Sequence, residues 1–112
     1  MRKILFALLC VAVSTPASAA TTFQQLRALG YAQMTSLSAA TALPSVPSGT
    51  QEAFIVCTGQ TVYWRDDGTS PTASVGVPLL VNTGFPYTGS LSKIKIIETT
   101  PSATCNVSYY GS

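Results

Sequence analysis

The sequence predicts a small all-β protein that folds as a single antiparallel β-sandwich, jelly-roll-like or Greek-key, preceded by a signal peptide. Three observations predict this class. Short segments rich in Val, Ile, Thr and aromatic residues follow one another along the chain. Pro and Gly separate them, with turns every ~8–12 residues, which is typical of sandwiches. Apolar and polar residues alternate within the segments, so each can bury one face.

The first nineteen residues have the three parts of a signal peptide. Two basic residues give a positive start, Ile4–Val13 is an unbroken apolar run, and Ala17–Ala19 offers the small residues of a cleavage site. A spanning helix needs about 20 apolar residues, and the run is half as long, so no stable membrane span is expected. We assign residues 1–19 to the signal and expect the mature chain to begin at Ala20.

Removal of 19 of the 112 residues leaves 93, enough for one domain with a modest core. Ala20–Ala28 is the only segment with helix-like spacing, Gly30 provides a stop, and a helix of this length is marginal by itself. Residues 20–30 are therefore expected to form a short N-terminal arm. Residues 31–112 are expected to form the sandwich.

Eight segments are expected to form strands. In one of them Ile94 and Ile96 alternate with lysines, which predicts a buried side and a solvent-facing side. In another, Pro78 interrupts the run and predicts an edge position, because proline cannot donate to the ladder. The expected strands are residues 31–37, 41–46, 52–58, 61–66, 75–81, 85–88, 91–98 and 104–110.

The mature chain has few charges and no net charge. Two of the six basic residues leave with the signal, so four basic residues balance four acidic ones. A neutral surface with so few charges releases few counterions from a phosphate backbone, so nucleic acid is not an expected partner.

The chain also lacks the residues of common catalytic and metal sites. It contains no histidine, the usual general base and the commonest metal ligand. Asp66 and Asp67 are the only adjacent acids, and neighbours on a turn do not form the two opposed carboxylates of a glycosidase. They are expected to cap the turn, with weak Ca²⁺ binding as the lesser alternative. We expect no enzyme activity, no catalytic residue, no cofactor and no metal.

Two cysteines, Cys57 and Cys105, remain after cleavage of the signal. An even number in an exported chain favours one disulfide, and two buried thiols are the alternative. Alternation places both on the apolar faces of their strands, so the bridge is expected to cross the core. In the chain-entropy model a bridge over this separation adds about 4 kcal/mol of stability.

The aromatic residues divide between the core and the surface. Trp64 alternates in phase with Val62, which predicts packing at the centre of the core, with a ligand platform as the alternative. Tyr63, Tyr87 and Tyr110 are expected to face outward, where tyrosines suit contacts with other proteins.

The stretch from Gly59 to Gly76 reads GQTVYWRDDGTSPTASVG. It resembles the signature GQ-V-x-WRDDG-T-x-PTA-x-VG of a family of small tailed-phage and prophage proteins. The segment Gly84–Ile97 and the closing Asn106–Tyr110 resemble the same family. The resemblance covers nearly all of the mature chain. It implies a virion-associated β-sandwich with a structural rather than a catalytic role.

A structural role can be given to each residue at the centre of this signature. Trp64 is expected to anchor its strand in the core. The charged residues Arg65, Asp66 and Asp67 are expected to build the following turn. Gly68 is expected to close the turn, because glycine accepts a positive φ without steric cost.

The signal and the cysteine pair depart from the family pattern, and both suit export to an oxidising compartment. Two functions stay open. The first is a phage-type structural protein that decorates or joins parts of a particle, with phage particle proteins or copies of itself as partners. The second is an exported binding module of prophage origin in the periplasm or at the cell surface. The expected location is the periplasm or the extracellular space, or a virion.

Overall fold

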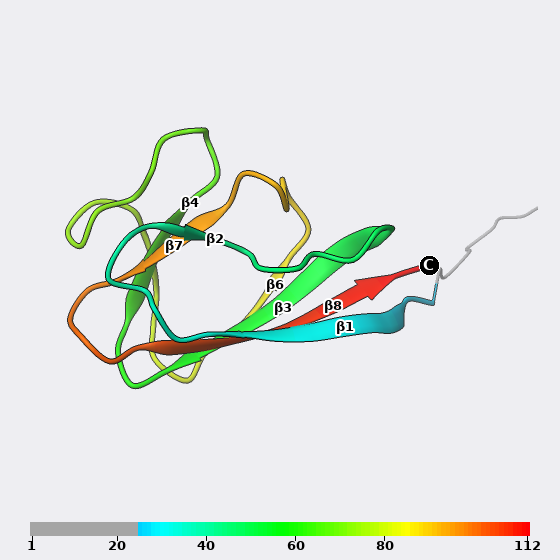
Figure 1. Cartoon of the computed structure of the whole chain (residues 1–112), viewed down its shortest axis with the longest axis horizontal. Coiled ribbons are helices and arrows are strands. Elements are labelled where there is room, and N and C mark those ends of the chain that lie inside the picture. Colours follow the sequence, from blue (N-terminus) through cyan, green and yellow to red (C-terminus); the bar gives the residue numbers. More distant parts are fainter. Residues whose placement is uncertain (1–24) are drawn as a thin grey trace, which may run out of the picture.

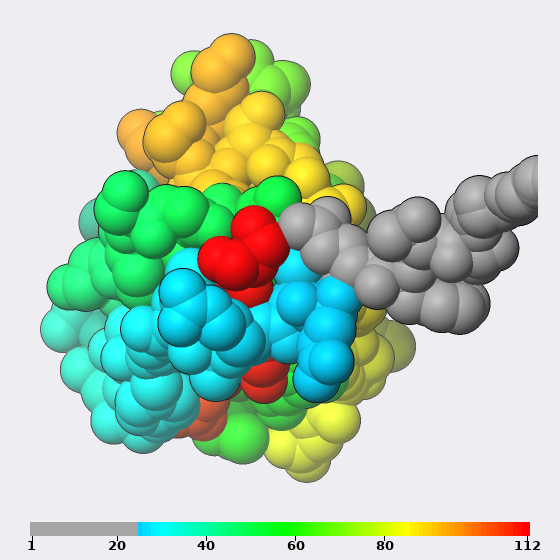
Figure 2. Space-filling view, turned by 90° about the vertical axis from the view of Figure 1, so that its right-hand side faces the viewer, coloured from blue at the N-terminus to red at the C-terminus, as the bar shows by residue number. Residues whose placement is uncertain are grey.

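The computed structural model describes residues 25–112. The expected signal peptide, its cleavage site and the first part of the expected arm lie outside these residues. The described chain consists of strands and loops, with two four-stranded antiparallel sheets packed against each other (Figure 1). In this part of the chain no helix is long and apolar enough to span a membrane. The start of the described chain and the C-terminus lie side by side at one end of the molecule (Figure 2).

Every strand overlaps a segment that the sequence predicts as a strand. The eight strands of the described residues are β1 (Arg27–Met34), β2 (Thr41–Ala42), β3 (Thr50–Thr58), β4 (Val62–Arg65), β5 (Val77–Leu79), β6 (Gly84–Tyr87), β7 (Lys95–Glu98) and β8 (Thr104–Gly111).

The order of the strands identifies the topology. Sheet A has the order β1-β8-β3-β6, and sheet B has the order β2-β7-β4-β5. The first strand therefore pairs with the last, the second with the seventh, the third with the sixth and the fourth with the fifth, all antiparallel. The chain is in effect one long hairpin rolled into two sheets. This is a jelly roll, the first of the two arrangements that the sequence left open.

The core lies between the two sheets and is formed by the alternating residues of the strands. In β8, for example, Cys105, Val107 and Tyr109 are buried, while the residues between them are only partly covered. The Tyr109 hydroxyl donates to the carbonyl oxygen of Pro44 at 2.6 Å, so its polar end is also satisfied. The largest fully buried side chains are Leu37, Ile55, Cys57, Val62, Ile94, Ile96, Cys105, Val107 and Tyr109.

The N-terminal boundary of the sandwich lies earlier than the sequence predicts. β1 begins at Arg27, so residues 27–30, which were assigned to the arm, belong to sheet A. Arg27 pairs with Gly111, and Leu29 is the extra residue where the register of β1 and β8 shifts. Gly30 does not end a helix here. Pairing with β8 makes this stretch a strand, and this pairing outweighs the helix-like spacing of its apolar residues.

Several expected strands are shorter than predicted, and β5 covers only Val77–Leu79 of the expected residues 75–81. β2 ends at Ala42 rather than Val46, and Pro44 within this stretch has no N–H for a ladder. Residues 91–94 form a turn rather than the first half of β7, because the Ser90 carbonyl accepts hydrogen bonds from two backbone N–H groups within this stretch.

The disulfide between Cys57 and Cys105 is present, and its two cysteines have a sequence separation of 48. The expectation that it crosses the core is wrong. Cys57 in β3 lies directly opposite Cys105 in the neighbouring strand β8, so the bridge joins two strands of sheet A on its inner face. Alternation identified the face of each cysteine correctly but carries no information about which sheet each strand joins.

Candidate functional site

Trp64 lies between the two sheets at one side of the sandwich. Its ring stacks on Phe85 with 5.1 Å between centroids and meets Tyr87 edge-on at 5.8 Å. Trp64 belongs to β4 of sheet B, whereas Phe85 and Tyr87 belong to β6, the edge strand of sheet A. The three rings therefore connect the two sheets at the side of the sandwich whose edge strands are β5 and β6. Trp64 packs against the core but is only partly buried, so its expected place at the centre of the core is wrong.

A hydrogen bond supports this aromatic contact. The Tyr87 hydroxyl donates to Asp66 Oδ2 at 2.6 Å. Only 5% of Tyr87 is exposed, so the expectation that it faces outward is wrong. Phe85 and Tyr87 lie opposite the buried Ile55 and Ala53 of β3, so their side chains share the inner face of sheet A. Burial raises the pKa of Tyr87 to about 12, with further contributions from the hydrogen bond and the charge of Asp66. The hydroxyl is therefore protonated at neutral pH and is a donor to the carboxylate.

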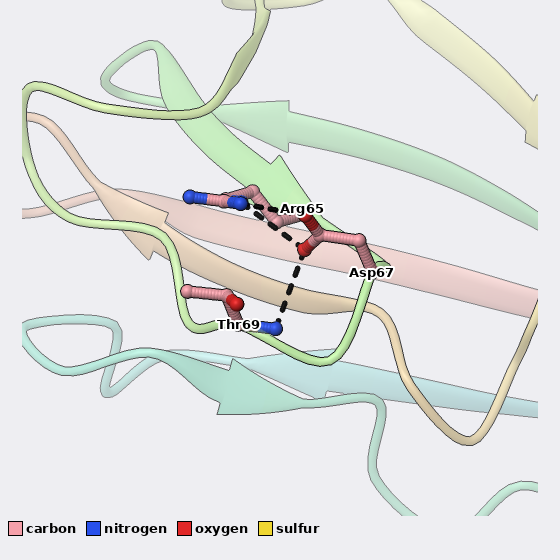
Figure 3. Close-up of polar contacts among 3 residues, drawn as sticks. All are labelled: Arg65, Asp67 and Thr69. Carbon is pink, nitrogen blue, oxygen red and sulfur yellow. Dashed lines mark hydrogen bonds and ion pairs between the residues drawn. The ribbon is translucent and has the colours of Figure 1, made fainter.

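Arg65 and Asp67 bind each other across the turn that follows β4 (Figure 3). Arg65 donates through Nε to Asp67 Oδ1 at 3.1 Å and through Nη2 to Oδ2 at 2.6 Å. The backbone N–H of Thr69 also donates to Asp67 Oδ1, at 3.3 Å. These bonds, above all the one from Arg65, lower the pKa of Asp67. Gly68 has a φ of +91°, so it supplies the left-handed conformation that this turn needs.

The rest of the signature folds back against β4. Pro71 is buried, and the backbone groups of Thr72 and Val75 exchange two hydrogen bonds of 2.9 and 3.2 Å. Gly76 passes so close to β4 that a Cβ there would lie 2.8 Å from the Cβ of Tyr63, and its φ is +156°. Packing and turn geometry therefore give a structural reason for the signature from Trp64 to Gly76.

The two adjacent aspartates do not share a site. Asp66 accepts a hydrogen bond from Tyr87, whereas Asp67 accepts from Arg65 and Thr69. Within residues 25–112, no three His, Cys, Asp or Glu side chains come together to hold a metal ion. The arrangement stabilises the turn after β4 and its contact with β6.

Exposed apolar side chains gather along residues 75–81. We call this set the β5 patch: Val75, Val77, Leu80 and Val81, of which Val75 is 52% and Leu80 61% exposed. The edge position predicted from Pro78 is confirmed, because β5 is the last strand of sheet B. Since β5 has only three residues and its central Pro78 lacks an N–H, this edge is poorly suited to backbone pairing. Its contacts would be made by side chains.

A cleft of about 550 Å³ lies elsewhere, between the connection from β2 to β3 and the turn before β7. This volume falls within the ~300–1,000 Å³ of small-molecule pockets. The lining contains no charged side chain. It consists of Ala42, Leu43, Val46, Pro47, Gly49, Thr50, Gly89, Leu91 and Ser92.

Comparison of the chain with protein-family models, curated proteins and solved structures finds no match. The class of protein is therefore defined by its own structure. It is a jelly-roll sandwich with one intra-sheet disulfide, an ordered turn after β4, an apolar patch beside β5 and an uncharged cleft.

Proposed function

We propose that this protein is a non-enzymatic structural protein of a phage-type particle, and that it decorates or joins parts of the particle through protein–protein contact. The β5 patch carries the proposal. Exposed apolar side chains grouped on a soluble domain are a feature of protein contact sites. A partner that covered Leu80 and Val81 would remove from water the apolar surface that the fold itself leaves open.

The structure next to the patch favours contact through a rigid surface. Val77 lies directly opposite Trp64 in the pairing of β5 with β4, so the patch adjoins the aromatic contact between the sheets. A rigid surface loses little conformational entropy on binding. The absence of net charge in the mature chain allows many copies to pack without long-range repulsion.

Two broader considerations support the same role. The likeness of the sequence from Gly59 to Gly76 to the phage signature favours particle association. The jelly roll is also an architecture of viral capsid domains, which is an argument by analogy of fold.

The proposed role includes export, which the disulfide and the expected signal both favour. The intact mass of the exported protein tests this step. We expect a mature N-terminus at Ala20, and an exported species that retains Met1–Ala19 would contradict it.

Crosslinking in purified particles, compared with the periplasmic fraction, tests the particle role. We expect crosslinks from the protein to particle proteins or to its own copies, and we expect Leu80→Asp to abolish them. Thr100→Asp, which adds the same charge at an exposed position between β7 and β8, is the matched control. Absence from particles, together with a monomer that crosslinks to nothing in the periplasm, would contradict the proposal.

The cleft favours a second candidate, an exported binding module for a small apolar ligand. A fluorescent apolar probe such as anilinonaphthalene sulfonate tests it. Saturable binding by the folded protein that Val46→Asp abolishes and Leu80→Asp leaves intact would favour this function over the first.

A further inference from the structure

Three of the four edge strands have features that oppose the addition of another strand. β5 and β6 each contain a proline, Pro78 and Pro86, and β2 has only two residues. Short or proline-containing edges resist pairing with another chain. The fourth edge strand is β1, which has eight residues and contains neither proline nor lysine. Within residues 25–112, β1 pairs with β8 and with no other strand.

The free side of β1 therefore presents backbone groups that can pair. In an antiparallel ladder, alternate residues direct both N–H and C=O away from the neighbouring strand. The register of β1 with β8 is regular from Gly30 to Met34, so this stretch is a straight template for another strand. Its outward side chains are Tyr31, which is 64% exposed, and Gln33. The only charged residue of the strand, Arg27, lies beyond this stretch.

We propose that β1 pairs antiparallel with β1 of a second copy of this chain, so that the two A sheets become one continuous eight-stranded sheet. A two-fold axis makes such a contact self-complementary, because each strand offers its partner the same donors and acceptors. The inference goes beyond the proposed function and does not rest on it, since it concerns a different edge and holds with or without a particle.

Charge favours the antiparallel direction. A parallel pair in register would place the two Arg27 side chains side by side, and like charges directly opposite each other destabilise a sheet. An antiparallel pair centred on Ala32 places them roughly 30 Å apart, taking about 3.3 Å per residue along a strand. At that distance salt screens their repulsion.

The outward side chains also suit an antiparallel pair. With Ala32 on the axis, Tyr31 of one copy lies opposite Gln33 of the other. Both side chains are already held along the outer face of sheet A, since the Tyr31 hydroxyl and Gln33 Nε2 donate to Asn106 Oδ1 at 2.6 and 3.0 Å. On the inner face, Gly30 packs against Pro47 and Ala32 packs against the core, so neither residue projects toward the second strand.

The contact is narrow, so its strength depends on concentration. Pairing of one short strand buries less than the ~1,000 Å² of a stable interface, and a weak, reversible dimer is therefore expected. Where copies are held close together, their effective concentration would increase the paired fraction.

Sedimentation of the purified protein at increasing concentration is the first test, and we expect the mass to double. The second test uses two double variants, Tyr31→Lys with Gln33→Lys and Tyr31→Glu with Gln33→Glu. Each should remain a folded monomer, because these side chains lie outside the core and like charges then face each other across the axis. An equimolar mixture of the two variants should form a dimer again, because the charges facing each other are then opposite.

A protein that stays monomeric at every concentration, or a dimer that persists in both charge variants, would overturn the inference. Loss of the dimer in Leu80→Asp together with its retention in both β1 variants would place the contact at the β5 patch, which supports the proposed function and contradicts this one. Should a charge variant fail to fold, hydrogen exchange of the unmodified protein decides. Alternate amides of residues 30–34 should exchange more slowly at high concentration, and unchanged rates there would contradict the pairing.

Discussion

The two sides of the sandwich are completed in different ways. At the β5–β6 side, three aromatic rings and the bond from Tyr87 to Asp66 connect the sheets, and both edge strands contain proline. At the β1–β2 side, the backbone N–H of Glu98 donates to the carbonyl oxygen of Leu37 at 2.9 Å, and β1 has no neighbour on its outer edge within residues 25–112. The first side can contact a partner through side chains, whereas the second can also do so through its backbone.

The largest effect is expected at the disulfide, which lies in the centre of sheet A between these two sides. Replacing both cysteines by serine should lower the free energy of unfolding by about 4 kcal/mol in the chain-entropy model. Chemical denaturation with and without reductant measures this, and the reduced parent protein should match the variant. Two labelled thiols in the unfolded, unreduced parent protein would show that the bridge is not formed.

The next largest effect should show that the two sides differ in their contribution to stability. Trp64→Ala removes a ring that contacts both sheets and should cost about 3 kcal/mol, toward the low end for tryptophan because the ring is only partly buried. Tyr31→Ala, the matched aromatic truncation at the β1 edge, should change stability by no more than about 0.5 kcal/mol. Denaturant titration of both variants tests the contrast. Equal losses would show that the two sides do not differ in stability.

The alternation of residues in the sequence predicted much of the fold. It identified all eight strands and the buried faces of Val107 and Tyr109 in β8, because a half-buried strand must alternate. The proline rule placed β5 at an edge. The pairing of Cys57 with Cys105 across one ladder could not be predicted, because it depends on which strands become neighbours, and that is settled by the folding of the whole chain.

The candidate site was predicted less well than the fold. The turn residues Arg65, Asp67 and Gly68 follow local rules, so their roles could be anticipated. The inward position of Tyr87 could have been inferred from its alternation with Pro86, but the strand that contains both is short and its periodicity is weak. The free edge of β1 became visible only once the order of the strands was known, since a sequence does not show which strand is left without a neighbour.

A third prediction tests the polar link at the β5–β6 side. Tyr87→Phe removes a hydrogen bond to a carboxylate and should cost about 1.5–3 kcal/mol at neutral pH. Asp66→Asn, which keeps an acceptor but removes the charge, should cost less. Guanidinium titration of the two variants measures the difference. A Tyr87→Phe variant as stable as the parent protein would show that the rings alone hold this side together.

Alkaline pH offers an independent check on Tyr87. Its pKa is raised from an unfolded value near 10 to about 12, because burial and the Asp66 carboxylate disfavour the phenolate. The unfolded chain then loses its proton first, so the stabilisation is complete below pH ~10 and is lost as the pH rises through 12. Two pKa units correspond to roughly 2–3 kcal/mol. In Tyr87→Phe this loss should shrink to the part due to Tyr109, whose pKa is also raised by burial.

The smallest effect is expected at Asp67. Its side chain is 55% exposed, and water and salt weaken an exposed ion pair, so its bond to Arg65 contributes little to global stability. Asp67→Ala should therefore lower the melting temperature less than Tyr87→Phe does. Asp67→Asn keeps an acceptor for the Thr69 N–H and should lower the melting temperature less still.

The pKa of Asp67 is lowered in the folded state, so its contribution to stability is present at neutral pH and disappears as the pH falls through that pKa. Thermal melts of the two variants at neutral and acidic pH test this, and the parent and variants should converge at acidic pH. A loss in Asp67→Ala as large as that in Tyr87→Phe would show that the turn after β4 and the aromatic contact stabilise the β5–β6 side as one unit.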